Sequence, residues 1–366
     1  MKGTGDMKVV VACGGTGGHA FPGLAVAEEL RKRGHDVTVW SSGRDIESSV
    51  MKSWSGAVFS TGAKQLRARN ALSILASIMR CRKAMKNNRP DVLLAMGSYS
   101  SLPPVLAAKS RGVPVVLHEA NTVPGKAVDF LSRFAVRVAI SFDVTAKFFA
   151  KVETVTTGLP VREEISKGER FDFIPADAFT VFVTGGSQGA HAVNMLMSEA
   201  LSMLKREMDR RQDKRLLYVI HQTGAKDESI VKASYSEAGI PARVKAFETD
   251  MADAFASADV VVARAGASTC FELAACGKPA LLIPLPSALR DHQHFNAEAF
   301  VEKGAADEGM QDRLKPLQVC RYLMQKMDHP EQLVAMKSRM ESLATPDAAA
   351  KVADVLESIG MPREAK

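Results

Sequence analysis

The stretches Lys8–His19 (KVVVACGGTGGH) and Phe179–Gly189 (FTVFVTGGSQG) share one design, in which an apolar run is followed by a glycine-rich turn. After each turn a helical stretch begins. The glycines allow the backbone to approach a phosphate closely, and the N–H groups at the start of the helix can bind it. One such turn indicates one nucleotide-type site. Two turns, about half a chain apart, predict two similar domains that face each other across a cleft.

Strand-like apolar runs alternate with amphipathic helical stretches along the whole chain. This alternation is typical of parallel sheets with right-handed crossovers, so the expected fold class is α/β with two Rossmann-like, doubly wound domains. Ligands of such sheets bind at the carboxyl ends of the strands. The expected strands are Val9–Ala12, Val37–Trp40, Val92–Ala95, Val113–Leu117, Val136–Ile140, Thr180–Val183, Leu216–Ile220, Ala242–Ala246, Val260–Ala263 and Ala280–Ile283.

The chain has 366 residues, which is more than a usual single α/β core contains. Gly158 and Pro160 interrupt the pattern before a polar stretch and a new strand. We therefore expect a first domain over residues 1–159 and a second over residues 160–345. The last helical stretch, within residues 346–366, is expected to pack back on the first domain.

The composition is that of an ordinary globular protein, with 46% hydrophobic and 24% charged residues. No apolar run reaches the roughly 18–20 residues that span a bilayer, and the first residues lack the pattern of a signal peptide. The five cysteines are scattered and form no Cys-x-x-Cys pair, so neither a disulfide framework nor a zinc site is expected. These features predict a reduced, cytosolic compartment.

Positive charge is concentrated between Glu47 and Asp91, where nine lysines and arginines occur without any acidic residue. Such a block favours an anionic partner. It flanks the apolar run Leu72–Met79, a composition typical of a helix on an anionic membrane surface. A core helix with a solvated basic end is the alternative. Nucleic acid is disfavoured, because the block has almost no interleaved aromatic residues and no nucleic-acid motif.

The first glycine turn is open to two interpretations. Gly15, Gly17 and Ala20 satisfy the Gly-x-Gly-x-x-Gly/Ala pattern of dinucleotide folds, but the second strand ends without the acidic residue that holds a ribose. Arg44 would instead suit the phosphate of NADP. Alternatively His19, where the turn becomes a helix, takes a proton from a hydroxyl nucleophile, or it merely caps or packs.

Further polar groups follow other expected strands. Ser187 in the second turn is suited to a phosphate oxygen, although a plain strand–helix turn would look the same. Glu272, in the run Arg264–Glu272, is suited to the two hydroxyls of a ribose. Asn121 brings a neutral amide to a strand exit.

A last polar cluster follows the expected strand Ala280–Ile283. Asp291 is a candidate helix N-cap, and it and Gln293 are suited to sugar hydroxyls. A metal site built from Asp291, His292 and His294 is disfavoured, because adjacent and alternate helix positions do not share a face.

Taken in order, these motifs resemble the MurG family of bacterial peptidoglycan glycosyltransferases, within glycosyltransferase family 28, over nearly the whole chain. The run from Gly14 to Ala25 carries the resemblance, together with Gly185–Ala190 and Arg264–Glu272. The resemblance implies a GT-B fold and transfer of GlcNAc from UDP-GlcNAc, with inversion, to the C4 hydroxyl of MurNAc. The acceptor is undecaprenyl-diphospho-MurNAc-pentapeptide (lipid I), and the product is lipid II. It also implies a peripheral enzyme on the cytoplasmic face of the inner membrane, docked through the segment Leu66–Lys86.

The resemblance also implies roles for single residues. His19 is the candidate general base, and Glu248 would recognise uracil through its backbone, although the family often has an apolar residue there. Phe271 is bulkier than the family's usual residue, and the loop before Gln293 is about one residue longer. No cofactor and no metal are expected. The substrate-binding residues that the resemblance implies are Thr16, Gly17, Gly18, Asn121, Arg162, Ser187, Gln188, Glu248, Ala267, Ser268, Thr269, Cys270, Phe271, Glu272 and Gln293.

Other activities fit parts of this pattern. Another GT-B enzyme acting on a UDP-sugar, such as an epimerase or a glycolipid glycosyltransferase, would share the nucleotide half and differ in its acceptor. An NADP-dependent oxidoreductase would leave the second glycine turn unexplained. A non-enzymatic protein of the lipid surface would explain the basic block alone.

Overall fold

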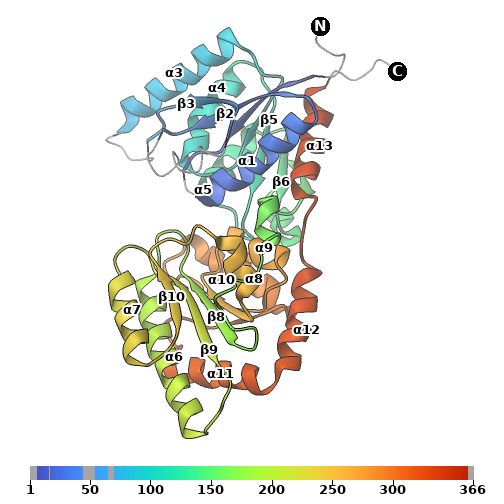
Figure 1. Cartoon of the computed structure of the whole chain (residues 1–366). Helices are drawn as coiled ribbons and strands as arrows, with labels where there is room; N and C mark the ends of the chain where they lie inside the picture. The colour runs from blue at the N-terminus through green and yellow to red at the C-terminus, as the bar shows by residue number, and fades with distance from the viewer. Residues whose placement is uncertain (1–5, 16, 44–53, 65–69, 362–366) are drawn as a thin grey trace. The chain divides into compact units, whose positions relative to one another are not determined.

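The computed structural model describes residues 6–15, 17–43, 54–64 and 70–361 (Figure 1). The chain divides into two compact units. The first comprises Met1–Arg162 together with Thr345–Lys366, and the second comprises Glu163–Ala344. Each unit is built on one parallel sheet and is described by itself below.

The sheet of the first unit has seven parallel strands in the order β3-β2-β1-β4-β5-β6-β7. The order reverses between β1 and β4, and α/β sheets bind ligands at the carboxyl ends of the strands beside such a reversal. The first glycine turn directly follows β1. The strands are β1 (Lys8–Ala12), β2 (Asp36–Ser41), β3 (Ala57–Ser60), β4 (Val92–Ala95), β5 (Val115–Glu119), β6 (Arg137–Ile140) and β7 (Glu153–Thr156).

The sheet of the second unit repeats this topology with six parallel strands in the order β10-β9-β8-β11-β12-β13. Its reversal lies between β8 and β11, and the second glycine turn directly follows β8. The strands are β8 (Phe179–Thr184), β9 (Leu217–Gln222), β10 (Ala242–Lys245), β11 (Val260–Ala263), β12 (Ala280–Leu282) and β13 (Ala306–Glu308).

All ten expected strands are present, and three further strands were missed. The missed strands β3, β7 and β13 each lie at an edge of a sheet and have only three or four residues. An edge strand is paired on one side and half solvated, so it does not need the continuous apolar run by which the central strands were recognised.

Helices cover the sheets. In the first unit they are α1 (Gly17–Lys32), α3 (Ala71–Asn87), α4 (Leu102–Ser110), α5 (Lys126–Leu131) and α13 (Ala348–Gly360). In the second they are α6 (His191–Arg210), α7 (Glu228–Glu237), α8 (Met251–Ser257), α9 (Ala267–Ala275), α10 (His292–Val301), α11 (Pro316–Asp328) and α12 (Pro330–Glu341). Short 3₁₀ turns are η2 (Tyr99–Ser101), η3 (Ser132–Phe134), η4 (Asp143–Phe148), η5 (Glu163–Ser166) and η6 (Leu289–Asp291). Within the described ranges, no helix is both long and apolar enough to cross a membrane.

The last helix, α13, belongs to the core of the first unit (Figure 1). Its buried Val352 and Leu356 share one apolar cluster with Val9 and Val11 of β1. The intervening Val10 of β1 belongs to the cluster on the other face of the sheet. This alternation places apolar side chains on both faces of β1, as expected for a central parallel strand.

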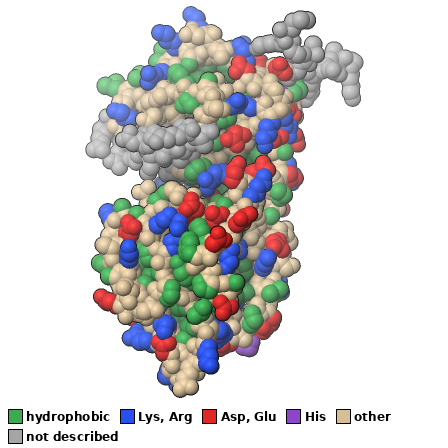
Figure 2. Space-filling model, in the orientation of Figure 1, with side chains coloured by type: hydrophobic (Ala, Val, Ile, Leu, Met, Phe, Trp, Pro, Cys, Tyr) green, Lys and Arg blue, Asp and Glu red, His purple; other side chains and the backbone are tan. Residues whose placement is uncertain are grey.

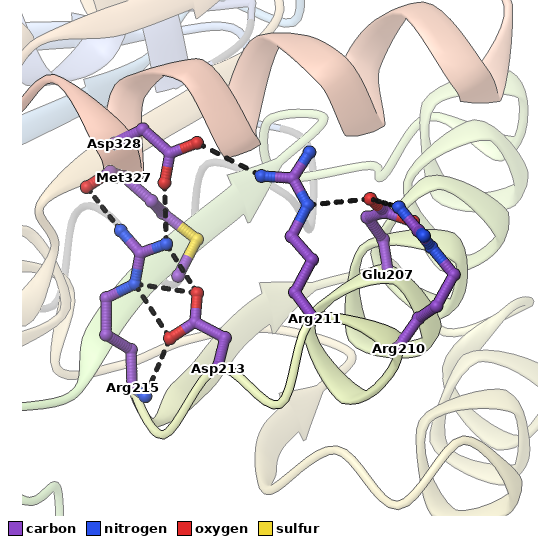
Figure 3. A network of polar contacts seen from close by, with 7 residues as sticks. All are labelled: Glu207, Arg210, Arg211, Asp213, Arg215, Met327 and Asp328. Atoms are coloured by element: carbon purple, nitrogen blue, oxygen red, sulfur yellow. Dashed lines mark hydrogen bonds and ion pairs between the residues drawn. The ribbon is translucent and has the colours of Figure 1, made fainter.

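Ion pairs connect the end of α6 to the end of α11 in the second unit (Figure 3). Arg211 bridges Glu207 at 2.7 Å and Asp328 at 3.3 Å, and Arg215 reaches Asp328 at 2.7 Å. These side chains are solvent-accessible, between 27% and 45% exposed, so the pairs contribute little to stability. The contact between the helices depends mainly on their buried apolar side chains, among them Leu201, Leu204, Met208, Leu323 and Met327.

Candidate functional site

The first glycine turn is shaped by the loop that follows the neighbouring strand β4. Gly15 has a φ of +123°, and a Cβ at this position would lie 2.6 Å from the Ser98 hydroxyl oxygen. The hydroxyls of Ser98 and Ser100 donate to the Gly14 carbonyl at 3.3 and 2.6 Å. The Gly14 carbonyl therefore points into the protein, which is the geometry that a turn for an anion requires. Thr16, the expected substrate contact at the tip, lies outside the described residues.

His19 stands at the third position of α1, directly behind this turn, and is partly buried. Its Nδ1 lies 2.9 Å from the backbone oxygen of Met96, at the end of β4. A carbonyl only accepts hydrogen bonds, so Nδ1 carries the proton in the neutral ring, and Nε2 carries the lone pair. The structure thus places His19 in the tautomer that a general base needs. Gly17 and Gly18 form the first turn of the same helix.

A second histidine of this unit, His118 in β5, is unsuited to that role. Its ring is buried, and its Nε2 donates to the backbone oxygen of Gly158 at 3.2 Å. Burial lowers the pKa of His118 to about 4. It is therefore a neutral structural residue at neutral pH.

Asn121 is held in the loop after β5 by the buried carboxyl group of Glu119. The backbone N–H and the side-chain Nδ2 of Asn121 donate to Glu119 Oε1 at 2.9 and 3.0 Å, and the N–H of Gly125 donates to Oε2 at 3.0 Å. Burial raises the pKa of Glu119, and these hydrogen bonds act in the opposite direction. Because Nδ2 faces Glu119, the amide oxygen of Asn121 faces the opposite way.

Arg162 is the last residue of the first unit. Its guanidinium lies over the ring of Phe21 in α1, with Cζ 4.2 Å from the ring centroid. This cation–π contact joins Arg162 to the helix that carries His19.

The backbone conformation of the second glycine turn likewise depends on the segments packed against it. Gly186 and Gly189 have φ values of +82° and +69°, and a Cβ on Gly189 would lie 2.0 Å from the backbone oxygen of Thr223. Ser187 and Gln188 are exposed at the tip. The helix α6 that follows has no side-chain cap and no acidic residue in its first turn. Its N-terminus therefore suits an anion.

The N-terminus of α9, which follows β11, also has no side-chain cap. Its N-cap residue, Gly266, has open space where a Cβ would stand. Ser268, Thr269 and Glu272 are partly exposed on this helix. The side chains of Ala267, Cys270 and Phe271 are buried, and Phe271 packs edge-on against Phe300. These three buried residues can therefore offer a ligand only backbone groups.

Arg264 is a structural residue in spite of its position at a strand end. It is 8% exposed, and its guanidinium donates to the backbone oxygens of Ile283 and Pro284, both at 3.1 Å, and to Gln311. These contacts tie the exit of β11 to the exit of β12.

Glu248 is almost fully buried, with 1% of its surface exposed. Burial would raise the pKa of Glu248, but the guanidinium of Arg243, 2.8 Å away, and the N–H of Asp250 outweigh it, so the pKa lies below its usual value. The backbone N–H of Glu248 donates to the side-chain oxygen of Gln222 at 3.0 Å.

The residues around Gln293 have different partners. The side-chain oxygen of Gln293 accepts from the N–H of Leu285, at the exit of β12, at 3.0 Å. His294 pairs with Glu308 at 2.8 Å, and His292 bonds the backbone oxygen of Leu289. Gln293 is thus directed to the exit of β12, whereas His294 is directed to the last residue of β13. In the described parts of the chain, no group of three or more His, Cys, Asp or Glu residues is placed to hold a metal ion.

The expectation that Asp291 caps helix α10 is wrong. The helix does begin at His292, but Asp291 makes no side-chain cap hydrogen bond. Arg290 and Asp291 both have left-handed backbone angles, with φ of 56° and 52°. A capping residue adopts extended backbone angles so that its side chain reaches back to the helix, and the left-handed angles prevent this.

Comparisons with known proteins indicate the same family for both halves of the chain. Residues 9–140 match the model of the glycosyltransferase family 28 N-terminal domain, and residues 180–353 match that of the C-terminal domain. A relative from Geobacter metallireducens is 37% identical over 364 residues, which cover 95% of this chain and 97% of the relative. It is named UDP-N-acetylglucosamine--N-acetylmuramyl-(pentapeptide) pyrophosphoryl-undecaprenol N-acetylglucosamine transferase.

The chain belongs to glycosyltransferase family 28.

Solved structures support this assignment. The crystal structure of Acinetobacter baumannii MurG superposes with a TM-score of 0.76 and 30% identity, covering 96% of this chain and 99% of that one. A UDP-GlcNAc 2-epimerase from Neisseria meningitidis, 13% identical with a TM-score of 0.71, covers 96% of this chain and 100% of that one and shares the fold alone. The expected GT-B fold, with its two Rossmann-like domains, is confirmed for this family 28 glycosyltransferase.

Several polar residues beside the candidate site were missed from the sequence. Glu119 and Gln222 are the last residues of β5 and β9, so a search for polar residues at strand ends would have found them. Ser98 and Ser100 follow β4 in the same way. Their importance depends on contacts with residues distant in the sequence, which no local pattern reveals.

Proposed function

We propose that this protein transfers GlcNAc from UDP-GlcNAc to the C4 hydroxyl of MurNAc in lipid I, with inversion at the anomeric carbon, in peptidoglycan synthesis. The observation that carries the proposal is the pair of glycine turns, each at the reversal of strand order in its own sheet, in a chain 37% identical to a transferase with that name. Two turns of this kind suit the two diphosphate-bearing substrates of the reaction.

Most donor contacts in this proposal come from the second unit, and Arg162 and Asn121 come from the first. The exposed tip Ser187–Gln188 and the uncapped start of α6 bind the diphosphate, with Arg162 as the cation. Uracil meets the backbone at Glu248, and the start of α9, Ala267–Glu272, holds the nucleotide, with Glu272 on the ribose. Gln293 and Asn121 contact the donor sugar.

The first unit binds the acceptor. Thr16, Gly17 and Gly18 meet the acceptor diphosphate, and His19 Nε2 takes the proton of the attacking hydroxyl. The hydroxyl attacks the anomeric carbon from the face opposite UDP, through an oxocarbenium-like state. Charge that develops on the departing UDP is stabilised by the N-termini of α6 and α9 and by Arg162.

The transfer itself is tested with radiolabelled UDP-GlcNAc and a short-chain analogue of lipid I. We expect a labelled disaccharide lipid, with UDP-GalNAc as a far poorer donor. Conversion of UDP-GlcNAc to another UDP-sugar in the absence of acceptor would instead support an epimerase, and the absence of any product with the lipid I analogue would contradict the proposed acceptor.

Replacement of Glu272 by alanine is expected to raise the Kd for UDP-GlcNAc about 10- to 100-fold, because a hydrogen bond to a charged group contributes about 1.5–3 kcal/mol. Calorimetric titration of the donor measures this. The matched control is Glu302→Ala, at an exposed glutamate beyond the end of α10. An unchanged Kd in the Glu272 variant would reject the ribose role.

We further propose that α3 docks this enzyme on the anionic, cytoplasmic face of the inner membrane, with no role for nucleic acid. The helix buries Ser77, Cys81 and Met85 and turns three large apolar side chains outward. Leu72 is 83% exposed, and Leu75 and Met79 are 56% and 53% exposed. A helix that buries a serine and exposes leucines has the opposite arrangement to a core helix in water.

The positive charges beside these exposed apolar side chains of α3 also suit an anionic membrane. Figure 2 shows blue Lys and Arg side chains beside green apolar ones over the region of α3. In the helix they are Arg80, Arg82, Lys83 and Lys86. Each basic residue near an anionic surface contributes about 1 kcal/mol. Residues 66–69 of the predicted docking segment lie outside the described residues.

A further inference from the structure

Gln222, the last residue of β9, lies between the second glycine turn and the loop that contains Glu248. It is 3% exposed. Its Nε2 donates to the backbone oxygen of Gly186 at 2.9 Å and to the hydroxyl oxygen of Thr184 at 3.2 Å. Its Oε1 accepts from the backbone N–H of Glu248 at 3.0 Å. One side chain thus joins two segments that lie about 60 residues apart, in the positions to which the diphosphate and the uracil have been assigned.

The orientation of this amide is determined by its partners. The N–H of Glu248 can only donate, so it must face Oε1, and the carbonyl of Gly186 can only accept, so it must face Nε2. A flipped amide would lose both hydrogen bonds and leave the buried N–H of Glu248 without its acceptor. Gln222 therefore holds both segments at once and at one spacing.

The hydrogen bond to Gly186 also determines which backbone group faces outward. The Gly186 carbonyl accepts from Gln222 Nε2 and from the N–H of Gly189, at 2.9 Å, so this oxygen points into the protein. In a trans peptide the C=O and the following N–H point in opposite directions. The inward carbonyl of Gly186 therefore directs the N–H of Ser187 outward, where an anion would bind.

We propose that Gln222 is a positioning residue that couples the diphosphate turn to the base-recognition loop of the donor site. This inference rests on the proposed function and deepens it. Gln222 holds the N–H of Ser187 outward and keeps the backbone of Glu248 at a constant distance from it. The site therefore fits a uridine that is joined to a diphosphate better than it fits uridine or diphosphate alone.

Two substitutions separate the two hydrogen-bonding ends of Gln222. Gln222→Glu keeps an acceptor for the N–H of Glu248 but offers the Gly186 carbonyl a carboxylate in place of a donor. In Gln222→Met the methionine side chain is similar in length to glutamine and makes neither hydrogen bond. The control Gln325→Glu makes the same charge change in α11, on an exposed side chain. Calorimetric titration with UDP and displacement titration with uridine are performed on all four proteins, after thermal unfolding shows that each is folded.

We expect Gln222→Glu to bind UDP at least about tenfold more weakly while its affinity for uridine changes less than about twofold, since a carboxylate then faces the Gly186 carbonyl beside the phosphate in place of a donor. Gln222→Met should lose affinity for both ligands, and Gln325→Glu for neither. Equal losses for UDP and uridine in Gln222→Glu would overturn the coupling. Unchanged UDP binding by both Gln222 variants would overturn the role of Gln222 alone, whereas failure of the unmodified protein to bind UDP would overturn the proposed function as well.

Discussion

Replacement of His19 by alanine is expected to lower kcat for transfer to a short-chain lipid I analogue by about 10²- to 10⁴-fold, the usual contribution of a general base. The reason is the proton arrangement of the ring. Nδ1 donates to the backbone oxygen of Met96 at 2.9 Å, so Nε2 carries the lone pair that receives the hydroxyl proton. Single-turnover measurements at saturating donor and acceptor give kcat for the chemical step.

A second variant separates this chemical role from a packing role. His19→Gln keeps an N–H for the Met96 carbonyl but has no basic nitrogen, so its kcat should fall as far as that of His19→Ala. The control His329→Ala removes a histidine whose side chain is 56% exposed in the second unit, and its kcat should be unchanged. Near-normal kcat in both His19 variants would exclude His19 as the base and leave the family assignment intact.

Combined replacement of Leu72, Leu75 and Met79 by glutamine is expected to weaken binding to phosphatidylglycerol vesicles by about 100-fold. Full burial of such a side chain contributes about 1.5–3 kcal/mol, and these three are already partly covered, so about 1 kcal/mol each is a reasonable value. Sedimentation with vesicles of graded anionic content measures the partition coefficient. Activity on a short-chain acceptor should be unchanged, because these exposed side chains are not among the residues proposed to bind either substrate.

The matched control replaces three exposed apolar residues of the second unit, Ile230, Leu317 and Val334, which are 57%, 48% and 67% exposed. This control should bind vesicles as the unmodified protein does. The unmodified protein should also bind less tightly as salt increases, because the basic residues of α3 act through a screened potential. Equal vesicle binding by the two triple variants, or binding indifferent to lipid charge, would show that α3 is not the docking surface.

The sequence alone was sufficient to predict the architecture of each unit. The strand, the glycine turn and the helix follow one another directly in the sequence. Central parallel strands are buried on both faces, so their continuous apolar runs can be recognised without knowledge of any tertiary contact. Strands β3, β7 and β13 were missed because edge strands have no such run. The family and its GT-B fold were likewise predicted from the motifs and are confirmed by the comparisons.

The candidate site could be predicted only in part. His19, Ser187 and Glu272 stand next to conspicuous turns, whereas Glu119 and Gln222 act on backbone groups of loops that the sequence does not connect to them. The alternatives for α3 could not be separated in the sequence, since a core helix and a membrane-surface helix have similar compositions. The structure adds which face is buried, the face of Ser77, Cys81 and Met85, and membrane docking by the other face stays a proposal.

The sequence by itself determined the two strand–turn–helix segments, because glycine geometry and apolar burial act over a few neighbouring residues. Only the tertiary structure decided where these turns lie, at the reversal of strand order, and how their groups are oriented. The tautomer of His19 depends on the carbonyl of Met96, and the outward N–H of Ser187 depends on Gln222. Hydrogen bonds of this kind join strands that are adjacent in the sheet and distant in the chain, so their direction is set by strand order and not by local sequence.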